Sequence, residues 1–575
     1  MKIPKLFPFA CVALMMTACA SDKDEIGGGT RPGSDPQYLA VNIVNVGATP
    51  TTRGTDDYEN GTTEESTIKK VRFYFFNGDG SPYLIKNPGV SGVEGGGDKN
   101  WLEASPADDS STSGTPSQIE KITQTVLVIN GVQSAAPAAI VAVVNPGTVD
   151  AAKIQDGETM RLSELRYSTV GSQFYKKDAT TGAVSDFVMS NSVYVNAGED
   201  VCASLVAGHV TTSEETARTK PVDLYVERVV AKVTADVDKT AFKLGNGTDW
   251  DANKYGTKTA VGESGDYDVY AVIDGWGLAD ENGKAEVEKQ VNKTWADGTL
   301  GFTPWTTADY HRCFWETSVA FVSGAGGNQP VNPTFNQLKA NKMQDVLYTL
   351  PNTPGSEVSD LKNNDLTKFA VAATLRYEDA AGNWHNAEIC RYNGVSILGI
   401  DNLKKQVALT FSQYYTSTDA TTYTQLSKDD IDFKNPNGTM QQYRVTPTLA
   451  DDPSNTKKYY TKTTSGTTPT FTEVDKATVL AAIEADKAEV RLDGRAYYYV
   501  PIKHLGGTSK IAEYGIVRNH FYKITLSGIT GFGTPVYDPD KVVAPAVPTY
   551  EDTYLAARVQ VLQWRVVNQN ASLGN

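Results

Sequence analysis

The sequence predicts an all-β protein with two tandem β-sandwich domains. Its 575 residues are too many for one hydrophobic core. The 49 glycines and 29 tyrosines, against only 7 methionines, favour short strands and turns over helical bundles. A hydrophobic share of 40% with 10% aromatic residues excludes a largely disordered chain.

The charge of the chain limits its partners. A formal net charge of -15 and a pI near 5.0 exclude a nucleic-acid reader, which needs a basic surface to displace counterions. After the first 20 residues, no apolar run approaches the length of about 20 residues that a membrane-spanning helix requires. We therefore expect neither nucleic acid nor a membrane span.

The N-terminus has the pattern of an export signal. Lys2 and Lys5 precede an apolar stretch from Leu6 to Met16, which is too short to cross a bilayer. The following Thr17-Ala18-Cys19 places small residues before a cysteine and is similar to the lipobox of bacterial lipoproteins. We expect residues 1–18 to be a signal peptide and Cys19 to be lipidated. An ordinary signal peptide with an incidental cysteine is the alternative.

The first strand is expected at Tyr38 to Val46, after a tether rich in Gly, Pro, Ser and Asp. Leu39, Val41 and Ile43 alternate with other residues, several of them also apolar. Apolar groups on both faces are typical of a strand that is covered on both sides inside a core.

A polar loop follows this strand. Residues 48–67 contain almost nothing that could be buried, and Arg53 is followed by Gly54. Arg31, by contrast, is followed by Pro32, a poor context for trypsin-like cleavage. We therefore expect a protease to cut after Arg53, leaving residues 19–53 as a lipidated propeptide.

Two strand-rich regions follow, one over residues 54–238 and one over 239–533. Near 445–490 a threonine-rich segment and a helix after Asp475, with Val479, Leu480 and Ile483 on one face, predict a small α+β insertion. The predicted strands are Ile68 to Phe76, Ile122 to Ile129, Ile140 to Val144, Val222 to Val233, Tyr267 to Asp274, Phe369 to Tyr377, Gln406 to Phe411, Ala496 to Ile502 and Phe521 to Leu526.

The C-terminus predicts a strand on a spacer. Four prolines between residues 534 and 550 favour an extended spacer over 534–556, and residues 557–575 carry a last strand. Its apolar residues fall on two faces: Val559 and Val561 on one, and Leu562, Trp564 and Val566 on the other. Such a strand must bury itself, either on its own domain or in another molecule.

Enzyme chemistry is not indicated. Neither the His311/Cys313 nor the His385/Cys390 spacing matches a recurrent zinc pattern. The calcium-like start at Asp249 lacks the required glycine and glutamate positions. Cys202, Cys313 and Cys390 do not form a disulfide framework, although one pair remains open. We expect no catalytic residues, no metal and no cofactor.

Several segments resemble the Bacteroidota type V pilins, the major fimbrial subunits of the Mfa and FimA type. Residues 515–533, with Arg518-Asn519, look like the family's penultimate strand, and residues 226–233 look like the strand that closes its N-terminal domain. Residues 140–146 look like an earlier strand, and residues 561–566 are similar to the last strand of the short-fimbria subunit. The insertion has no counterpart in this resemblance.

The resemblance implies transthyretin-like, Greek-key sandwiches and assembly by donor-strand exchange. An arginine-specific surface protease would remove the propeptide, and the C-terminal strand of the next subunit would fill the groove. Implied partners are further copies of the chain, anchor and tip subunits, and host or bacterial surface receptors. Implied locations are an outer-membrane lipoprotein precursor and a mature surface fimbria that supports adhesion and biofilm formation.

Two other functions remain open. An anchored lipoprotein could bind glycans or nutrients through tryptophans such as Trp276, Trp305, Trp315 and Trp384, although tryptophans are more often core residues. Within the pilins, the chain could be a tip or anchor subunit. A polymerising subunit needs both the Arg53 loop and a detachable last strand, whereas a nutrient binder needs neither.

Overall fold

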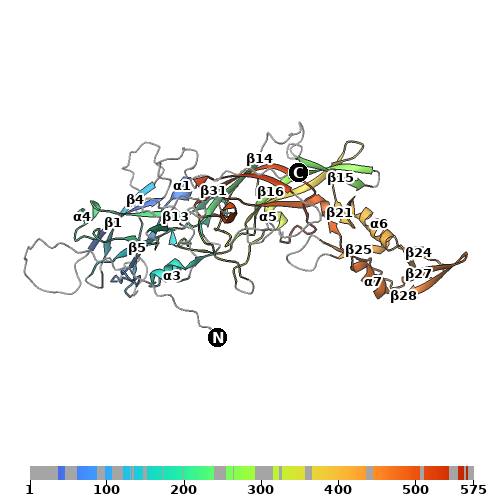
Figure 1. Cartoon of the computed structure of the whole chain (residues 1–575), viewed down its shortest axis with the longest axis horizontal. Helices are drawn as coiled ribbons and strands as arrows, with labels where there is room; N and C mark the ends of the chain where they lie inside the picture. Colours follow the sequence, from blue (N-terminus) through green and yellow to red (C-terminus); the bar gives the residue numbers. More distant parts are fainter. Residues whose placement is uncertain are drawn as a thin grey trace, which may run out of the picture.

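A computed structural model of the chain shows an elongated all-β molecule (Figure 1). It describes residues 37–45, 61–86, 97–105, 121–129, 131–132, 135–146, 152–171, 174–196, 199–237, 254–262, 265–291, 315–322, 327–355, 366–434, 444–504, 510–542, 554–561 and 565–566. The prediction of an all-β fold is confirmed, with few and short helices.

An eight-stranded sheet forms the N-terminal part, in the order β3-β2-β5-β9-β13-β1-β4 with β12 paired to β5. Every residue of β2 and β5 is buried, as their apolar sequences predict. The strands are β1 (Gln37–Asn45), β2 (Val71–Phe76), β3 (Trp101–Ala104), β4 (Lys121–Ile129), β5 (Ala139–Val144), β9 (Met189–Asn191), β12 (Ser204–Leu205) and β13 (Val222–Arg228).

Short elements surround this sheet. Two of the small sheets are hairpin-like pairs, β7 with β8 and β10 with β11, while β6 pairs with β17 from farther along the chain. These elements are α1 (Thr63–Ser66), α2 (Ala152–Gln155), α3 (Leu162–Arg166), α4 (Glu214–Arg218), β6 (Thr169–Val170), β7 (Lys176–Lys177), β8 (Val184–Ser185), β10 (Tyr194–Asn196), β11 (Glu199–Val201) and β17 (Ala285–Glu286).

Two further sheets form the C-terminal sandwich. A five-stranded sheet has the order β18-β14-β31-β33, with β34 also on β31. A nine-stranded sheet has the order β29-β21-β22-β15-β16-β19-β30-β32, with β20 on β19. The contacts of β15 with β31 and of β30 with β33 show that the two sheets face one another. Apolar residues from both are continuous with the core of the N-terminal sheet.

The elements of this sandwich are spread over more than 300 residues. They are β14 (Ala231–Val237), β15 (Lys254–Gly262), β16 (Gly265–Ala279), α5 (Phe335–Ala340), β18 (Val346–Thr349), β19 (Lys368–Glu378), β20 (Trp384–Asn386), β21 (Ile389–Tyr392), β22 (Val395–Leu398), β29 (Glu489–Val490), β30 (Arg495–Pro501), β31 (His520–Thr530), β32 (Thr534–Pro535), β33 (Tyr554–Val561) and β34 (Arg565–Val566). Short 3-10 helices cover Leu492–Gly494 and Lys510–Glu513.

An α+β unit with its own core lies at the end of the molecule opposite the N-terminal sheet (Figure 1). Asp475 caps α7, accepting a hydrogen bond from the Ala477 amide at 3.0 Å, and Val479 and Ile483 are buried, as predicted. The elements are α6 (Ile400–Thr410), β23 (Tyr414–Ser417), β24 (Thr424–Gln425), a 3-10 helix (Lys428–Asp430), β25 (Ile431–Lys434), β26 (Thr446–Leu449), β27 (Lys458–Ser465), β28 (Thr468–Val474) and α7 (Lys476–Glu484).

This unit begins earlier in the chain than the predicted insertion at about 445. The strand predicted at Gln406 to Phe411 is wrong, because these residues belong mostly to α6. Leu403 and Val407 are buried one helical turn apart, and the short window starting at residue 406 hid this spacing.

The predicted strand Val222 to Val233 is two strands. It bends at Val229 and Val230, so that β13 lies in the N-terminal sheet and β14 in the five-stranded C-terminal sheet. The predicted domain boundary at residue 238 assigns β14 to the N-terminal domain. In the structure β14 instead pairs with β18 and β31 of the C-terminal sandwich. An unbroken apolar run does not show which sheet covers each half of it.

Candidate functional site: the first and last strands

The first strand, β1, is paired along both of its edges. It runs antiparallel to β4 from Gln37, opposite Ile129, to Asn45, opposite Lys121. On its other edge Val41 to Asn45 run parallel to β13. Nearer its start, the Tyr38 amide donates to the Thr211 carbonyl at 2.8 Å, and the Thr211 amide donates to the Tyr38 carbonyl at 2.9 Å.

Both faces of β1 are covered. Leu39 and Val41 on one face and Ala40 on the other are each 0% exposed. For Ile43 the structure gives the backbone position, opposite Thr123 and Leu224. Burial of Leu39 and Val41 contributes about 1.5–3 kcal/mol each relative to exposure.

The neighbours of β1 depend on it to different degrees. β13 also pairs with β9, whereas β4 pairs in this sheet with β1 alone among the described strands. Removal of β1 would leave two facing edges with unpaired backbone donors and acceptors. Such edges, with apolar side chains between them, form a site for an extended strand.

The last long strand, β33, lies at the edge of its sheet among the described strands. It runs antiparallel to β31 of its own chain, with Val559 opposite Ile524 and Val561 opposite Tyr522. After it, β34 runs parallel to the start of β31, with Val566 opposite Phe521. The chain thus docks its C-terminal strand on itself, which is one of the two arrangements left open by the sequence. The strand begins within the predicted spacer.

The remaining predicted site residues lie outside the described part of the chain. These are Cys19, Arg53, Gly54, Leu562 and Trp564. The described chain ends at Asn45 after β1 and resumes at Gly61 before α1.

The cysteines described are buried free thiols. Cys202 and Cys390 are 7% and 0% exposed, and burial raises the pKa of the Cys202 thiol to about 11. A thiol with a raised pKa is a poor nucleophile at neutral pH. His385 instead contacts Asp379, with 2.8 Å between Nε2 and Oδ2.

Neither a metal centre nor a membrane helix is found in the described ranges. Within them, no three His, Cys, Asp or Glu residues are grouped so as to hold a metal ion. None of the helices described there is long and apolar enough to span a membrane. Asp249, where the discounted calcium-like pattern begins, and His311 and Cys313 lie outside these ranges.

Sequence reasoning missed a set of buried charges between the N-terminal sheet and the C-terminal sandwich. The Arg518 Nε lies 2.8 Å from Glu316 Oε2, and Lys232 Nζ lies 2.8 Å from Glu65 Oε1. Burial acts to raise the pKa of Glu65, but the ion pair with Lys232 and a hydrogen bond from Tyr348 outweigh it and lower that pKa. Charged residues inside apolar strand sequences were the available signal.

Comparison with known proteins finds a similarity in the C-terminal region. A family model described as the major fimbrial subunit protein type IV, fimbrillin, C-terminal, matches residues 492–570. This range contains both β31 and β33. No curated protein matches the chain.

Solved structures with similar features are distant. A proposed cell adhesion protein from Parabacteroides distasonis is 13% identical, with 94% of this chain and 98% of that chain covered and a TM-score of 0.35. The tip fimbrial protein Mfa3 from Porphyromonas gingivalis is 11% identical, with 62% and 83% covered and a TM-score of 0.24. TM-scores below 0.5 do not establish a shared arrangement, so the assignment depends on the C-terminal match. That match supports the resemblance to fimbrial subunits, because residues 492–570 are similar to the C-terminal region of a major fimbrial subunit.

Proposed function

We propose that this chain is the structural major subunit of a cell-surface fimbria and polymerises by donor-strand exchange. The observation that carries the proposal is the unequal pairing of two strands. β1 has neighbours on both edges, whereas β33 is an edge strand on β31. A copy of the C-terminal strand that moves into the place of β1 gains a second set of backbone hydrogen bonds.

The gain can be estimated from general magnitudes. Each additional backbone hydrogen bond contributes about 1 kcal/mol net, and each large apolar side chain about 1.5–3 kcal/mol. Association and ordering costs offset part of this gain. Because the groove and the donor lie on different parts of the chain, the contact is heterologous and does not close. Repetition of it produces a filament.

Processing would open the groove. In this proposal Cys19 anchors the precursor to the outer membrane, and an arginine-specific surface protease cuts between Arg53 and Gly54. The released segment then includes β1. Anchor and tip subunits, together with host or bacterial receptors, complete the set of partners for adhesion and biofilm formation.

Of the tryptophans named for a glycan-binding or nutrient-binding lipoprotein, Trp276 and Trp315 lie in the core. Trp384 on β20 is instead half-buried and lies against Tyr270, with 5.5 Å between ring centroids. Trp276 and Trp315 are 0% and 1% exposed, so neither offers a face to a sugar. Trp276 donates its indole N–H to the Lys342 carbonyl at 2.7 Å and packs near Phe369. These are core positions.

The N-terminal residue of protein sheared from cells tests the proposal. We expect mass spectrometry to find Gly54 in wild-type fimbriae and an unpolymerised lipoprotein in the Arg53→Ala variant. Arg31→Ala, at an arginine followed by proline, is the matched control and should polymerise normally. A lipidated start at Cys19 in the sheared protein would instead indicate an anchor subunit or a binding lipoprotein.

The donor role has a separate test. Deletion of residues 557–575 should give a processed, soluble monomer that forms no fibre, because the groove then has no strand to accept. Fibres of normal length from this variant would contradict the role of the C-terminal strand.

A further inference from the structure

Two segments singled out in the sequence, residues 226–233 and Arg518-Asn519, meet in the structure. β13 and β14 form one ribbon that bends at Val229 and Val230 and passes from the N-terminal sheet into the C-terminal sandwich. Both valines are 0% exposed. The turn before β31 lies against this bend, because the Asn519 amide donates to the Val230 carbonyl at 2.7 Å.

Arg228 connects three segments at the bend. Its Nε donates to the Glu65 carbonyl at 2.8 Å, its Nη2 to Ser66 Oγ at 3.0 Å and its Nη1 to Asn519 Oδ1 at 3.2 Å. The side chain is 3% exposed. One planar guanidinium thus joins the end of β13, helix α1 and the turn before β31.

Glu65 makes the second set of contacts across the junction. It is 0% exposed and lies on α1, which belongs to the N-terminal part. Its Oε1 pairs with Lys232 Nζ of β14 at 2.8 Å and accepts a hydrogen bond from the Tyr348 hydroxyl of β18 at 2.5 Å. Its Oε2 accepts from the Thr62 amide at 2.8 Å, so both oxygens are used.

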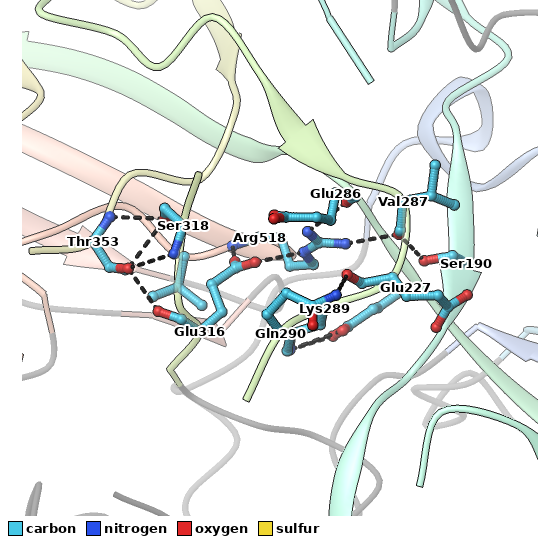
Figure 2. A network of polar contacts seen from close by, with 12 residues as sticks. Ser190, Glu227, Glu286, Val287, Lys289, Gln290, Glu316, Ser318, Thr353 and Arg518 are labelled. Carbon is cyan, nitrogen blue, oxygen red and sulfur yellow. Dashed lines mark hydrogen bonds and ion pairs between the residues drawn. The ribbon is translucent and has the colours of Figure 1, made fainter. Parts of the chain in front are cut away.

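Arg518 makes the third set (Figure 2). Its amide and Nε donate to the two oxygens of Glu316 at 2.7 and 2.8 Å. Its Nη1 donates to the Val287 carbonyl at 3.0 Å, the same carbonyl that accepts from Ser190 Oγ of β9 at 2.5 Å (Figure 2). Beside them Lys289 Nζ donates to Glu227 of β13 at 2.8 Å.

Aromatic packing supports the same junction. The Tyr348 ring of β18 lies 4.8 Å from Phe187 and 5.4 Å from Tyr175, measured between centroids. Phe187 and Tyr175 belong to the N-terminal part of the chain. Directional bonds at three separate points, with apolar packing between them, restrict rotation in a way that a single flexible linker does not.

We propose that Glu65, Arg228 and Arg518 are positioning residues that fix the angle between the N-terminal sheet and the C-terminal sandwich. This inference rests on the proposed function. The sheet would hold the groove and the sandwich the donor strand, so their angle repeats at each subunit and sets the pitch of the filament. A subunit with a loose junction would exchange strands but build irregular fibres.

Double electron–electron resonance on the monomer tests the rigidity directly. Spin labels at exposed positions, introduced by Glu215→Cys on α4 and Glu378→Cys on β19, report the distance between the two parts. The full chain would carry serine in place of Cys11, Cys19 and Cys313, while the two buried thiols remain. We expect one narrow distance distribution for this protein and a distribution at least twice as broad after Glu65→Gln.

A graded series keeps the test decisive. Arg518→Lys retains the positive charge but loses the planar guanidinium group, and it should broaden the distance distribution. Lys458→Ala is the control and should leave the distribution unchanged, because the side chains of its ion pair are 60% and 54% exposed. Circular dichroism checks that each variant is folded. If the Arg518→Lys variant does not fold, the near-isosteric Glu65→Gln variant alone provides the test. A broad distribution in the unaltered protein, or no broadening in either junction variant, would overturn the proposal.

Filament images separate this inference from the proposed function. If the unaltered chain forms no filament, the proposed function fails, whatever the distance distribution. If the Glu65→Gln chain forms filaments with a spread of pitch no wider than that of the unaltered chain, the positioning role fails while strand exchange stands.

Discussion

Replacement of Glu288 by glutamine should stabilise the protein increasingly as the pH rises. Glu288 is 0% exposed, and neither carboxylate oxygen has a hydrogen-bond partner of normal geometry in the part of the chain that the structure describes. Burial raises its pKa well above the usual value, and Glu227 raises it further. Arg518, Arg166 and the Asn191 amide act in the opposite direction without compensating.

The sign follows from proton linkage. Between the ordinary carboxyl pKa near 4.5 and the raised value, the unfolded chain has released this proton and the folded chain still holds it. The stability that the neutral form provides is therefore complete below pH 4.5 and is lost as the pH rises towards the folded pKa. Each pH unit in this window removes about 1.4 kcal/mol from the free energy of unfolding. Glutamine does not titrate, so its variant does not show this loss.

Thermal unfolding at pH values from 4 to 8 measures the effect. A change of 1 kcal/mol shifts the midpoint of a domain of 150–250 residues by about 2–4 °C, so the difference between variant and parent should grow visibly with pH. The buried amide of the variant also needs hydrogen-bond partners, and their lack can add a pH-independent offset to the stability difference. The informative quantity is therefore the slope of that difference against pH. Glu215→Gln, at an exposed position on α4, is the matched control, and the slope for Glu288→Gln should exceed the slope for this variant. A pH-independent difference for Glu288→Gln would refute the reasoning.

Three further predictions concern the core. Lys368 Nζ lies 2.6 Å from Asp280 Oδ2, and Lys368→Met removes this buried ion pair. The substitution should lower the free energy of unfolding by about 3–5 kcal/mol in denaturant titrations. A loss no larger than that of the same substitution at an exposed lysine would contradict the importance of the pair. Gly275→Ala would bring a Cβ to 2.4 Å from the Leu338 carbonyl oxygen and should cost about 1–3 kcal/mol, seen as a lower melting temperature. Leu39→Ala should destabilise the uncleaved precursor by about 2–5 kcal/mol, and faster amide exchange in β1 and β4 should accompany the loss. Unchanged exchange there would mean that β1 contributes little to the sheet.

Strand positions were predictable where the side-chain period was clear. The first strand was expected at 38–46 and is found at Gln37–Asn45, and its burial on both faces follows from apolar residues at successive positions. The helix after Asp475 was predictable for a related reason, since an N-cap residue and an apolar face with helical spacing occur together.

Pairings between distant residues were not predictable in this way. Tyr348 and Glu65 are 283 positions apart, and Arg518 and Glu316 are 202 apart. A single sequence shows that charges interrupt two apolar segments, but it does not show which charges meet. The bend at Val229 escaped prediction for the same reason, because the sheet that covers each half of the ribbon is a property of the whole fold.

The pairing of β33 with β31 of the same chain suggests a reason why the proposed cleavage after Arg53 would be needed for assembly. Before cleavage, β1 is tethered beside the groove at an effective concentration on the order of millimolar or more, and it pairs along both edges. In the proposed mechanism, a donor from another molecule would have to leave its own β31 edge and also displace this tethered strand, so exchange would be unfavourable in the precursor. If a protease cut β1 from the chain as proposed, dilution would remove the tethered competitor, and only the single β31 edge would oppose exchange. One proteolytic step would thus reverse the balance between self-docking and assembly without any change in the donor strand.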